Sequence, residues 1–395
     1  MKLTVAFIGC GNFARNFVNL FKVHPDVEKV YVCDLIPEKA EEYKNLFDVE
    51  IIPTFEDALA DDSINCIINF TQRHLHGDIV IRALKAGKHV YSAVPMASTV
   101  DECREIVELV RKTGLIYLMG ETCYYYPCAM FCREAYAQGR FGEFTYGASQ
   151  YYHHIDAISY GKRPGEGGMP PLLYPTHSTG MILSAVDSYV KRVTCFGNKT
   201  TDERFQKGNN FWDNEYVNQY VFMELANGGV ARVSEARNFG WRKPSSFISA
   251  LYGTKGGYEF SNAQHILVEK DVTSEKERVM LTDVSDYVNT EGMVQNKHLE
   301  DFKNQVANGA WQSDDVAKVQ LKEMERLPKS YEACKNGHMS THKFLVDDFV
   351  TAVVKNEQPI LNAAVGARYT VPGLVAIESL NNGGIPMDVP DFGEL

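Results

Sequence analysis

Residues 2–23 read KLTVAFIGCGNFARNFVNLFKV, an apolar run, a glycine-containing turn and a segment with helical spacing. A buried strand followed by such a turn and a helix is the context in which Gly-x-Gly-x-x-Ala binds a dinucleotide. Gly9 permits the tight turn, Gly11 lets a pyrophosphate approach the backbone, and Ala14 allows the helix to pack closely on the strand. The free N–H groups of the helix N-terminus favour the pyrophosphate charge. The stretch therefore predicts a nucleotide-binding Rossmann unit.

The next apolar run, residues 27–35, contains Asp34 near its end. A carboxylate at this point could accept hydrogen bonds from the hydroxyls of an adenosine ribose, and its charge would repel a 2′-phosphate. This placement favours NAD over NADP. The alternative is that Asp34 only caps the following helix.

Strands and helices continue to alternate up to residue 121. This pattern predicts a doubly wound parallel sheet whose functional loops lie at the carboxyl ends of the strands. The candidate residues on those loops are Thr71, Arg73, His76, Ala93, Val94 and Glu121.

The composition limits the function further. The 395 residues suggest two domains. The formal net charge of -11 disfavours a nucleic-acid-binding surface, which requires a basic patch. Nine cysteines without regular spacing are typical of a reducing compartment, and no apolar run is long enough to cross a membrane. Because Met1 leads directly into the first strand, we expect no signal peptide and a cytoplasmic protein.

Several segments together resemble the Gfo/Idh/MocA oxidoreductases over nearly the whole chain: GCGNFA (9–14), TQRHLH (71–76), GKHVYSAVP (87–95) and NNGGIPMDVP (381–390). The resemblance implies a Rossmann domain over residues 1–122. It also implies a second α/β domain over residues 123–395 with a large, open, mostly antiparallel sheet, and a last helix at about 363–382 that packs back on the first domain. The cofactor is then NAD, and its predicted contacts are Gly9, Gly11, Asn12, Phe13, Ala14, Asp34, Thr71, Arg73, His76, Ala93, Val94 and Glu121.

Two departures from the family pattern bear on function. The family's Glu-Lys-Pro motif reads Ala93-Val94-Pro95, and Leu173 stands where ordinary members have an aspartate four residues before the catalytic histidine. The family's lysine helps to remove the hydroxyl proton during hydride transfer, whereas Val94 has no ionisable group. The usual dehydrogenase machinery is therefore absent.

Residues 174–177, Tyr-Pro-Thr-His, resemble the NAD-dependent glycosidase branch of the family, which also lacks the lysine. That resemblance implies glycoside hydrolysis by transient oxidation at C3 of a sugar, elimination, water addition and re-reduction. His177 and Tyr174 are the predicted catalytic pair, with the imidazole as base and the phenol as relay. If the segment is helical, the two side chains share one face. The alternative is a buried aromatic residue and a buried histidine without a catalytic role.

The predicted sugar contacts lie further along the chain. A strand over residues 149–156 places two adjacent histidines on opposite faces, which argues against both binding one metal. A Gly/Pro-rich loop at 162–171 suits a substrate lid or a plain surface connection. The stretch 234–244 could bind an anionic substituent or stack on a sugar, or could be structural. The candidates are Tyr151, His153, His154, Arg163, Arg237 and Trp241.

No metal site is predicted, because the cysteines at 123, 128 and 132 lack a fourth ligand at suitable spacing. The leading function is an NAD-dependent glycosidase acting on a small sugar or glycoside, and an anionic sugar is one candidate. The alternatives are a sugar or polyol dehydrogenase of the same family and a catalytically silent NAD-binding sensor. By analogy with the family, we expect a homodimer or homotetramer.

Overall fold

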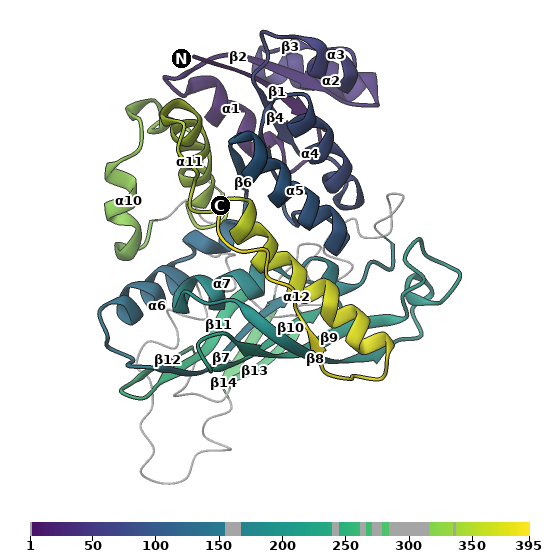
Figure 1. The fold of residues 1–395 in the computed structure, drawn as a ribbon, viewed down its shortest axis with the longest axis vertical. Helices are drawn as coiled ribbons and strands as arrows, with labels where there is room; N and C mark the ends of the chain where they lie inside the picture. Colours follow the sequence, from purple (N-terminus) through teal and green to yellow (C-terminus); the bar gives the residue numbers. More distant parts are fainter. Residues whose placement is uncertain are drawn as a thin grey trace.

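The structure is a computed structural model that describes residues 2–154, 167–238, 245–260, 266–270, 279–283, 316–334 and 337–395. It contains two main sheets, one above the other in Figure 1, with helices packed against both. The predicted fold class is confirmed: a parallel Rossmann-type sheet is followed by a second, mostly antiparallel sheet.

The first sheet has six strands in the order β3-β2-β1-β4-β5-β6, and each neighbouring pair is parallel. This is the strand order of a dinucleotide-binding fold, with the switch point between β1 and β4. The strands are β1 (Leu3–Ile8), β2 (Val27–Cys33), β3 (Glu50–Ile51), β4 (Cys66–Asn69), β5 (His89–Ser92) and β6 (Tyr117–Met119).

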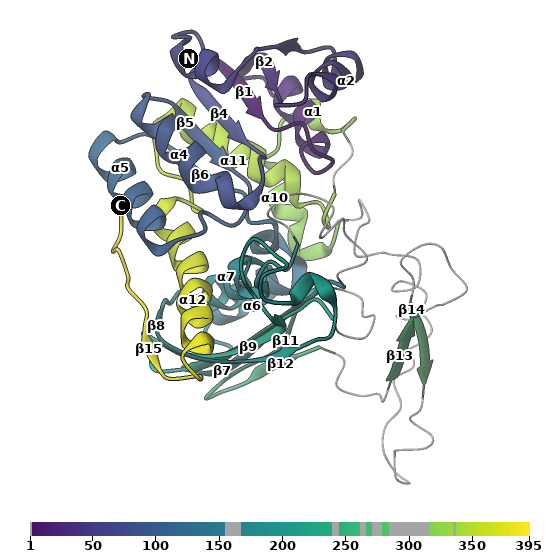
Figure 2. The same ribbon diagram turned by 90° about the vertical axis from the view of Figure 1, so that its right-hand side faces the viewer.

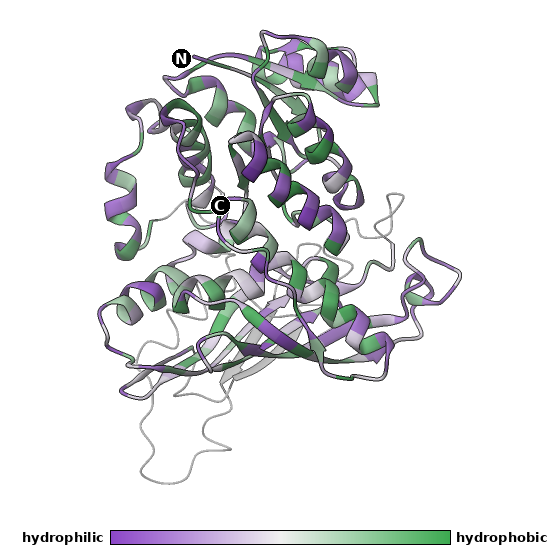
Figure 3. Cartoon of the chain, in the orientation of Figure 1, coloured by the Kyte–Doolittle hydropathy of each residue, from purple (hydrophilic) through white to green (hydrophobic). Residues whose placement is uncertain are grey.

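The helices of this half connect the parallel strands: α1 (Arg15–Val23), α2 (Pro37–Phe47), α3 (Phe55–Ala60), α4 (His76–Lys85) and α5 (Val100–Thr113). Local sequence fixes several of their ends. For example, Thr99 and Glu102 form a reciprocal capping box at the start of α5, and Gly114 ends that helix with φ +71°. Strands β1 and β4 are largely buried and hydrophobic, as Figure 3 shows.

The second sheet has seven strands in the order β12-β11-β7-β10-β9-β8-β15, with only the β7–β10 pair parallel. The strands are β7 (Phe144–Tyr152), β8 (Val190–Lys199), β9 (Tyr216–Leu225), β10 (Val230–Ala236), β11 (Ser246–Gly253), β12 (Gly257–Glu259) and β15 (Met387–Asp388). A separate two-stranded ribbon consists of β13 (Ile266–Lys270) and β14 (Val279–Asp283).

The remaining helices are α6 (Pro127–Ala137), α7 (Thr176–Val186), α10 (Leu321–Glu325), α11 (Thr341–Lys355) and α12 (Ala363–Asn381). Helix α7 packs against β7, β10 and β11 on one side and against α6 and α12 on others. Helix α12 contacts α5 and β6 of the first sheet's half as well as β8 of the second sheet (Figure 2). Among the described residues, no helix is long and apolar enough to cross a membrane.

Short 3-10 turns lie beside several candidate site residues. The turns are η1 (Arg73–Leu75) after β4, η2 (Thr122–Tyr125) after β6, η3 (Pro171–Leu173) before α7, and η4 (Glu203–Phe205) between β8 and β9. Arg73 is in η1, Glu121 precedes η2 and Tyr174 follows η3. The first two turns follow carboxyl ends of parallel strands, where doubly wound folds place their ligands.

Candidate active site

Three side chains form a buried hydrogen-bonded chain. The hydroxyl of Tyr174 lies 2.6 Å from Nε2 of His177, and Nδ1 of the same imidazole lies 2.6 Å from a carboxylate oxygen of Glu121. If Nδ1 carries the proton and donates it to the carboxylate, Nε2 is left as an acceptor for the tyrosine hydroxyl. The arrangement is therefore a phenol–imidazole–carboxylate relay.

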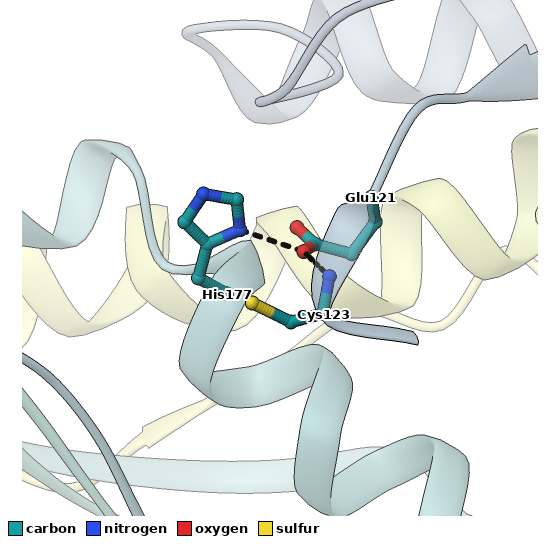
Figure 4. Close-up of side chains that lie close together, drawn as sticks. All are labelled: Glu121, Cys123 and His177. Atoms are coloured by element: carbon teal, nitrogen blue, oxygen red, sulfur yellow. Dashed lines mark hydrogen bonds and ion pairs between the residues drawn. The ribbon is translucent and has the colours of Figure 1, made fainter. Parts of the chain in front are cut away.

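Glu121 is fully buried at the end of β6, where it precedes η2. Its Oε1 also accepts a hydrogen bond of 2.8 Å from the backbone N–H of Cys123, and Figure 4 shows both contacts converging on that oxygen. Burial alone would raise the pKa of the carboxyl, but the charge and hydrogen bond of His177, helped by Thr176 and the Cys123 N–H, hold the pKa below its ordinary value. Glu121 is thus a carboxylate that can stabilise a protonated imidazole.

The first turn of α7 holds His177 rigidly. Ser178, the next residue, accepts a 2.7 Å hydrogen bond at its carbonyl from Ser149 of β7, and its hydroxyl donates to Glu235 of β10. Thr179 donates 2.7 Å to the carbonyl of Tyr369 in α12. Nearly every residue of α7 is buried, including the polar residues of its first turn. The second sheet and α12 therefore fix the orientation of the imidazole.

Tyr174 reaches His177 by a different geometry from the predicted one. A shared face was expected if the segment were helical, but α7 begins at Thr176 and Tyr174 lies in the turn after η3, with φ -123° and ψ 61°. That condition is not met for Tyr174, because the residue before a proline is disfavoured in the helical conformation and Tyr174 precedes Pro175. The contact between the two side chains nevertheless forms.

Other predicted residues surround Tyr174. The guanidinium carbon of Arg73 lies 4.7 Å from the centroid of its ring. Tyr151 packs edge-on against Tyr174 at 5.8 Å and against His177 at 5.0 Å, and His153 packs against Tyr151 at 5.6 Å. The structure thus gathers residues predicted for the cofactor, the substrate and the catalytic pair around one phenol.

Arg237 lies behind this group. Its side chain is only 1% exposed, its guanidinium carbon lies 4.9 Å from the Tyr151 ring, and it forms an ion pair of 3.1 Å with Glu235. Burial raises the pKa of Glu235 to about 8, against the opposing effect of the neighbouring guanidinium. Arg237 therefore contacts Tyr151 from the buried side, and its direct contact with a substrate stays a prediction.

The charge of His154 contributes to the lowered pKa of Asp202, which lies between β8 and β9, after the larger effect of Arg204. The contact of His154 with a sugar stays a prediction. The other predicted sugar contacts, Arg163 and Trp241, lie outside the described residues.

The glycine turn after β1 has the geometry that a dinucleotide requires. Gly9 has φ +99°, and a Cβ on it would lie 2.6 Å from the carbonyl oxygen of Phe70, so only glycine fits. A Cβ on Gly11 would meet nothing within 4 Å. Asn12 and Phe13 are exposed while Ala14 is fully buried against the sheet. The turn therefore leaves its backbone open to a pyrophosphate.

Asp34 is placed for both of the roles that the sequence suggested as alternatives, the contact with an adenosine ribose and the cap of the following helix. Its Oδ2 accepts a hydrogen bond of 2.8 Å from the N–H of Cys10 in the glycine turn. Its Oδ1 accepts one of 2.9 Å from the N–H of Ile36, the residue before α2. Each oxygen keeps a further lone pair for a ribose hydroxyl. The donors of a ribose diol therefore fit this carboxylate.

The loops after β4 and β5 are joined by His76. Its ring nitrogens lie 2.8 Å from the carbonyl of Pro95 and 3.2 Å from that of Thr71, and burial lowers its pKa to about 4. Thr71 itself donates 2.7 Å to Asn69. Ala93 and Val94 are almost fully buried. These contacts shape the loops; direct contacts of the four residues with NAD stay predictions.

One group of side chains in the described part of the chain could hold a metal ion. Ligand atoms of Glu121, Cys123 and His177 lie within 4.8 Å of one another (Figure 4). Burial raises the pKa of the Cys123 thiol well above its ordinary value, so the thiol stays protonated, and Glu121 and His177 already bond each other. The group is better explained as part of the relay.

Two histidines that were not among the predicted site residues approach the glycine turn. His338 and His342, near the start of α11, pack against Phe13 at 5.5 and 5.6 Å and against each other at 4.9 Å. Burial, and then the charge of His177, lower the pKa of His338 to about 4. The signal in the sequence was the short run GHMSTH at 337–342, which has no helical or strand period.

Known proteins resemble this chain in sequence and in fold. Residues 3–121 match the family model Gfo/Idh/MocA, described as "Oxidoreductase family, NAD-binding Rossmann fold". Among sequence relatives, a glycosyl hydrolase family 109 protein of Saccharopolyspora erythraea is 25% identical over 65% of this chain and 62% of its own length. Another, from Streptomyces filamentosus, is 23% identical over 98% of this chain and 77% of its own. An alpha-N-acetylgalactosaminidase of Bacteroides fragilis is 22% identical over 84% of this chain and 76% of its own length.

Solved structures share the whole fold. A levoglucosan dehydrogenase in complex with NADH and levoglucosan superposes with a TM-score of 0.69 at 17% identity, over 99% of this chain and all of that one. Scyllo-inositol dehydrogenase of Lactobacillus casei, with bound NAD(H) and scyllo-inositol, superposes with a TM-score of 0.67 at 14% sequence identity. The match covers 98% of this chain and 99% of that one. The expected cofactor, NAD, and the resemblance to the glycosidase branch are thereby confirmed. Residues 3–121 therefore match the NAD-binding Rossmann fold of the Gfo/Idh/MocA oxidoreductases, and the sequence relatives resemble their glycosidase branch.

Proposed function

We propose that the protein is an NAD-dependent glycosidase in which Tyr174, His177 and Glu121 move the proton of a sugar hydroxyl. The observation that carries the proposal is the buried chain of two 2.6 Å hydrogen bonds from Tyr174 through His177 to Glu121. This chain supplies a proton acceptor in a protein whose Val94 cannot act as one. The names of the sequence relatives support the choice of glycoside hydrolysis.

The relay works by passing one proton inward. When the Tyr174 hydroxyl gives its proton to Nε2 of His177, the phenolate oxygen can accept the proton of the sugar's C3 hydroxyl. The Glu121 carboxylate, which is bonded to Nδ1, stabilises the imidazolium that results. The positive charge of Arg73 over the phenol ring favours the anionic form of the phenol.

When bound at the glycine turn, NAD would supply a hydride acceptor at C3 that can return the hydride later in the cycle. Gly9, Gly11 and Asp34 would hold its pyrophosphate and adenosine ribose. Tyr151 and His153, which pack beside the relay, would contact the sugar ring. Arg237 supports Tyr151 from the buried side.

The chemistry requires C2 of the sugar to lose its proton while C3 is a ketone, so solvent hydrogen must enter at C2. The experiment incubates the NAD-loaded protein with p-nitrophenyl α-N-acetylgalactosaminide, chosen from the name of one relative, and with the matching galactosides, glucosides and glucuronides, in deuterated water. We expect release of p-nitrophenol, deuterium at C2 of the sugar product and no net NADH. Equal cleavage by protein stripped of all dinucleotide would contradict the proposal.

A sugar or polyol dehydrogenase is the second candidate, because solved structures with the same fold include inositol and levoglucosan dehydrogenases. The same relay would then serve a single oxidation. Free NAD⁺ distinguishes the two functions: stoichiometric NADH with a free sugar or inositol favours the dehydrogenase, and glycoside cleavage without NADH favours the glycosidase.

A further inference from the structure

The loop that joins β8 to β9 carries an aromatic pair next to the candidate site, of which Phe211 is exposed and Trp212 is partly buried. The ring centroids of Phe211 and Trp212 are 5.0 Å apart, and the two rings are nearly perpendicular. Their centroids lie 5.5 and 6.4 Å from the centroid of the His74 imidazole in η1. Phe211 is 68% exposed. Single exposed hydrophobic residues are common on protein surfaces, but Phe211 is distinguished by its contacts with a second aromatic ring and with the imidazole of His74.

The loop around the pair is held by several internal hydrogen bonds, so the exposure of Phe211 does not come from an unstructured loop. The carboxamide oxygen of Asn210 accepts 3.1 Å hydrogen bonds from the N–H groups of both Trp212 and Asn214, and its amide donates to the carbonyls of Gln206 and Asn214. Asp213 accepts 2.8 Å from the N–H of Gly208. This network fixes the direction in which the aromatic residues project.

Two contacts place the pair beside Tyr174. His74, which touches both rings, follows Arg73, and the Arg73 guanidinium covers the ring of Tyr174. The loop also joins the segment that leads to Tyr174, because Asn214 donates 3.0 Å to the carbonyl of Gly168. A Cβ on Gly168 would lie 2.6 Å from Cβ of Asn210, so the two segments are in direct contact. The order in space is Tyr174, Arg73, His74 and then the aromatic pair.

We infer that Phe211 and Trp212, together with His74, form a subsite that binds the leaving group of a glycoside through the face of an aryl or pyranose ring. The inference rests on the proposed function, since a leaving group exists only if a glycosidic bond is present. The apolar face of a sugar or aryl ring packs well against aromatic rings held at this kind of angle. The neighbouring Arg73 and His74 supply donors for hydroxyl groups at the edge of such a ring.

The experiment compares pairs of ligands that differ only in the leaving group. Calorimetric titration of the NAD-loaded full chain measures the dissociation constants of p-nitrophenyl and methyl α-N-acetylgalactosaminide, and then of the corresponding α- and β-galactosides and glucosides. For at least one pair, the wild-type protein should bind the aryl glycoside about tenfold more tightly than the methyl glycoside. In Phe211→Ala this preference should fall to about twofold or less, with methyl glycoside and NAD affinities unchanged.

Two further variants control the result. Phe211→Tyr keeps the ring and should keep the preference. Phe222→Ala removes a phenylalanine that is 50% exposed on β9, where it lies on the opposite face from the buried Val221 and Met223, and should behave as the wild type does. A preference that survives in Phe211→Ala, or a wild-type protein without aryl preference in any pair, would overturn the inference. Selective binding without release of p-nitrophenol would instead reject the glycosidase function and keep the subsite.

Discussion

The nucleotide turn and the relay are built in opposite ways. Gly9, Gly11 and Ala14 follow one another within six residues, and their geometry depends on the strand and helix on either side. The relay is assembled from β6, the turn after η3 and the first turn of α7, and it is held by bonds to the second sheet and α12. One region is local in the sequence, and the other exists only when both halves of the chain are packed together.

This difference predicts which property a substitution in each region changes. A substitution in the glycine turn should change cofactor affinity with little effect on the proton path, and a substitution in the relay should do the reverse. The two properties can be measured separately, as the dissociation constant of NAD and as turnover with saturating NAD.

The largest effect is expected from removing the imidazole. His177→Ala should lower turnover by about 10³-fold or more, because no other described group bonds both Tyr174 and Glu121. Tyr174→Phe should lower turnover by about 10²- to 10³-fold. Steady-state kinetics on the best glycoside of the panel measures both losses.

In these two variants the affinity for NAD, measured by titration, should stay within about twofold of the wild type. Near-normal turnover in both would show that the pair is only a buried structural contact. A parallel loss of NAD affinity would show that the two regions are not separable.

Glu121 provides a sharper test, since the sequence assigned it to the cofactor and the structure bonds it to His177. In Glu121→Gln the neutral amide cannot stabilise an imidazolium, and its NH₂ group can instead donate to Nδ1, which leaves Nε2 protonated and unable to accept from Tyr174. Turnover should fall by about 10²- to 10³-fold with NAD affinity unchanged. If Glu121→Gln instead weakens NAD binding and spares turnover, the role predicted from the sequence is the right one.

The sequence predicted the parts of the molecule whose physics is local. The parallel sheet, the glycine turn and the position of Asp34 follow from apolar runs and turn residues, and the structure has them where expected. The contact between Tyr174 and His177 was predicted, although for the wrong backbone. Glu121 as their partner was not predicted, because residues 121 and 177 are brought together only by packing of α7 on η2. No period or spacing in a single sequence records such a contact.

His76 connects the two loops of the nucleotide half and should make the stability of that half depend on pH. Its pKa in the folded chain is lowered to about 4 from an ordinary value of 6.5, so between these pH values the unfolded chain binds a proton that the folded chain does not. Stability is then fully present above pH 6.5 and is lost as the pH falls toward 4, by about 3 kcal/mol from this group.

The measurement is the urea-unfolding free energy of the wild type and of His76→Gln at pH 7 and pH 4. The difference between the two proteins should narrow by up to about 3 kcal/mol at the lower pH. A constant difference would show that the imidazole between Thr71 and Pro95 takes up its proton at the same pKa in the folded and the unfolded chain.

The smallest effect is expected beside the nucleotide turn, at Asp34. Asp34→Asn removes the charge but keeps one oxygen, which can still accept from the N–H of Cys10, so the glycine turn should hold its shape. NAD affinity should fall by about tenfold, because an amide is a weaker acceptor for the ribose hydroxyls, and the discrimination against NADP should shrink since the repulsive charge is gone. Titration with both cofactors measures this, with turnover at saturating NAD as the control. A variant that binds NAD as the wild type does would leave Asp34 with only its bonds to Cys10 and Ile36, and the local region would then depend on its glycines alone.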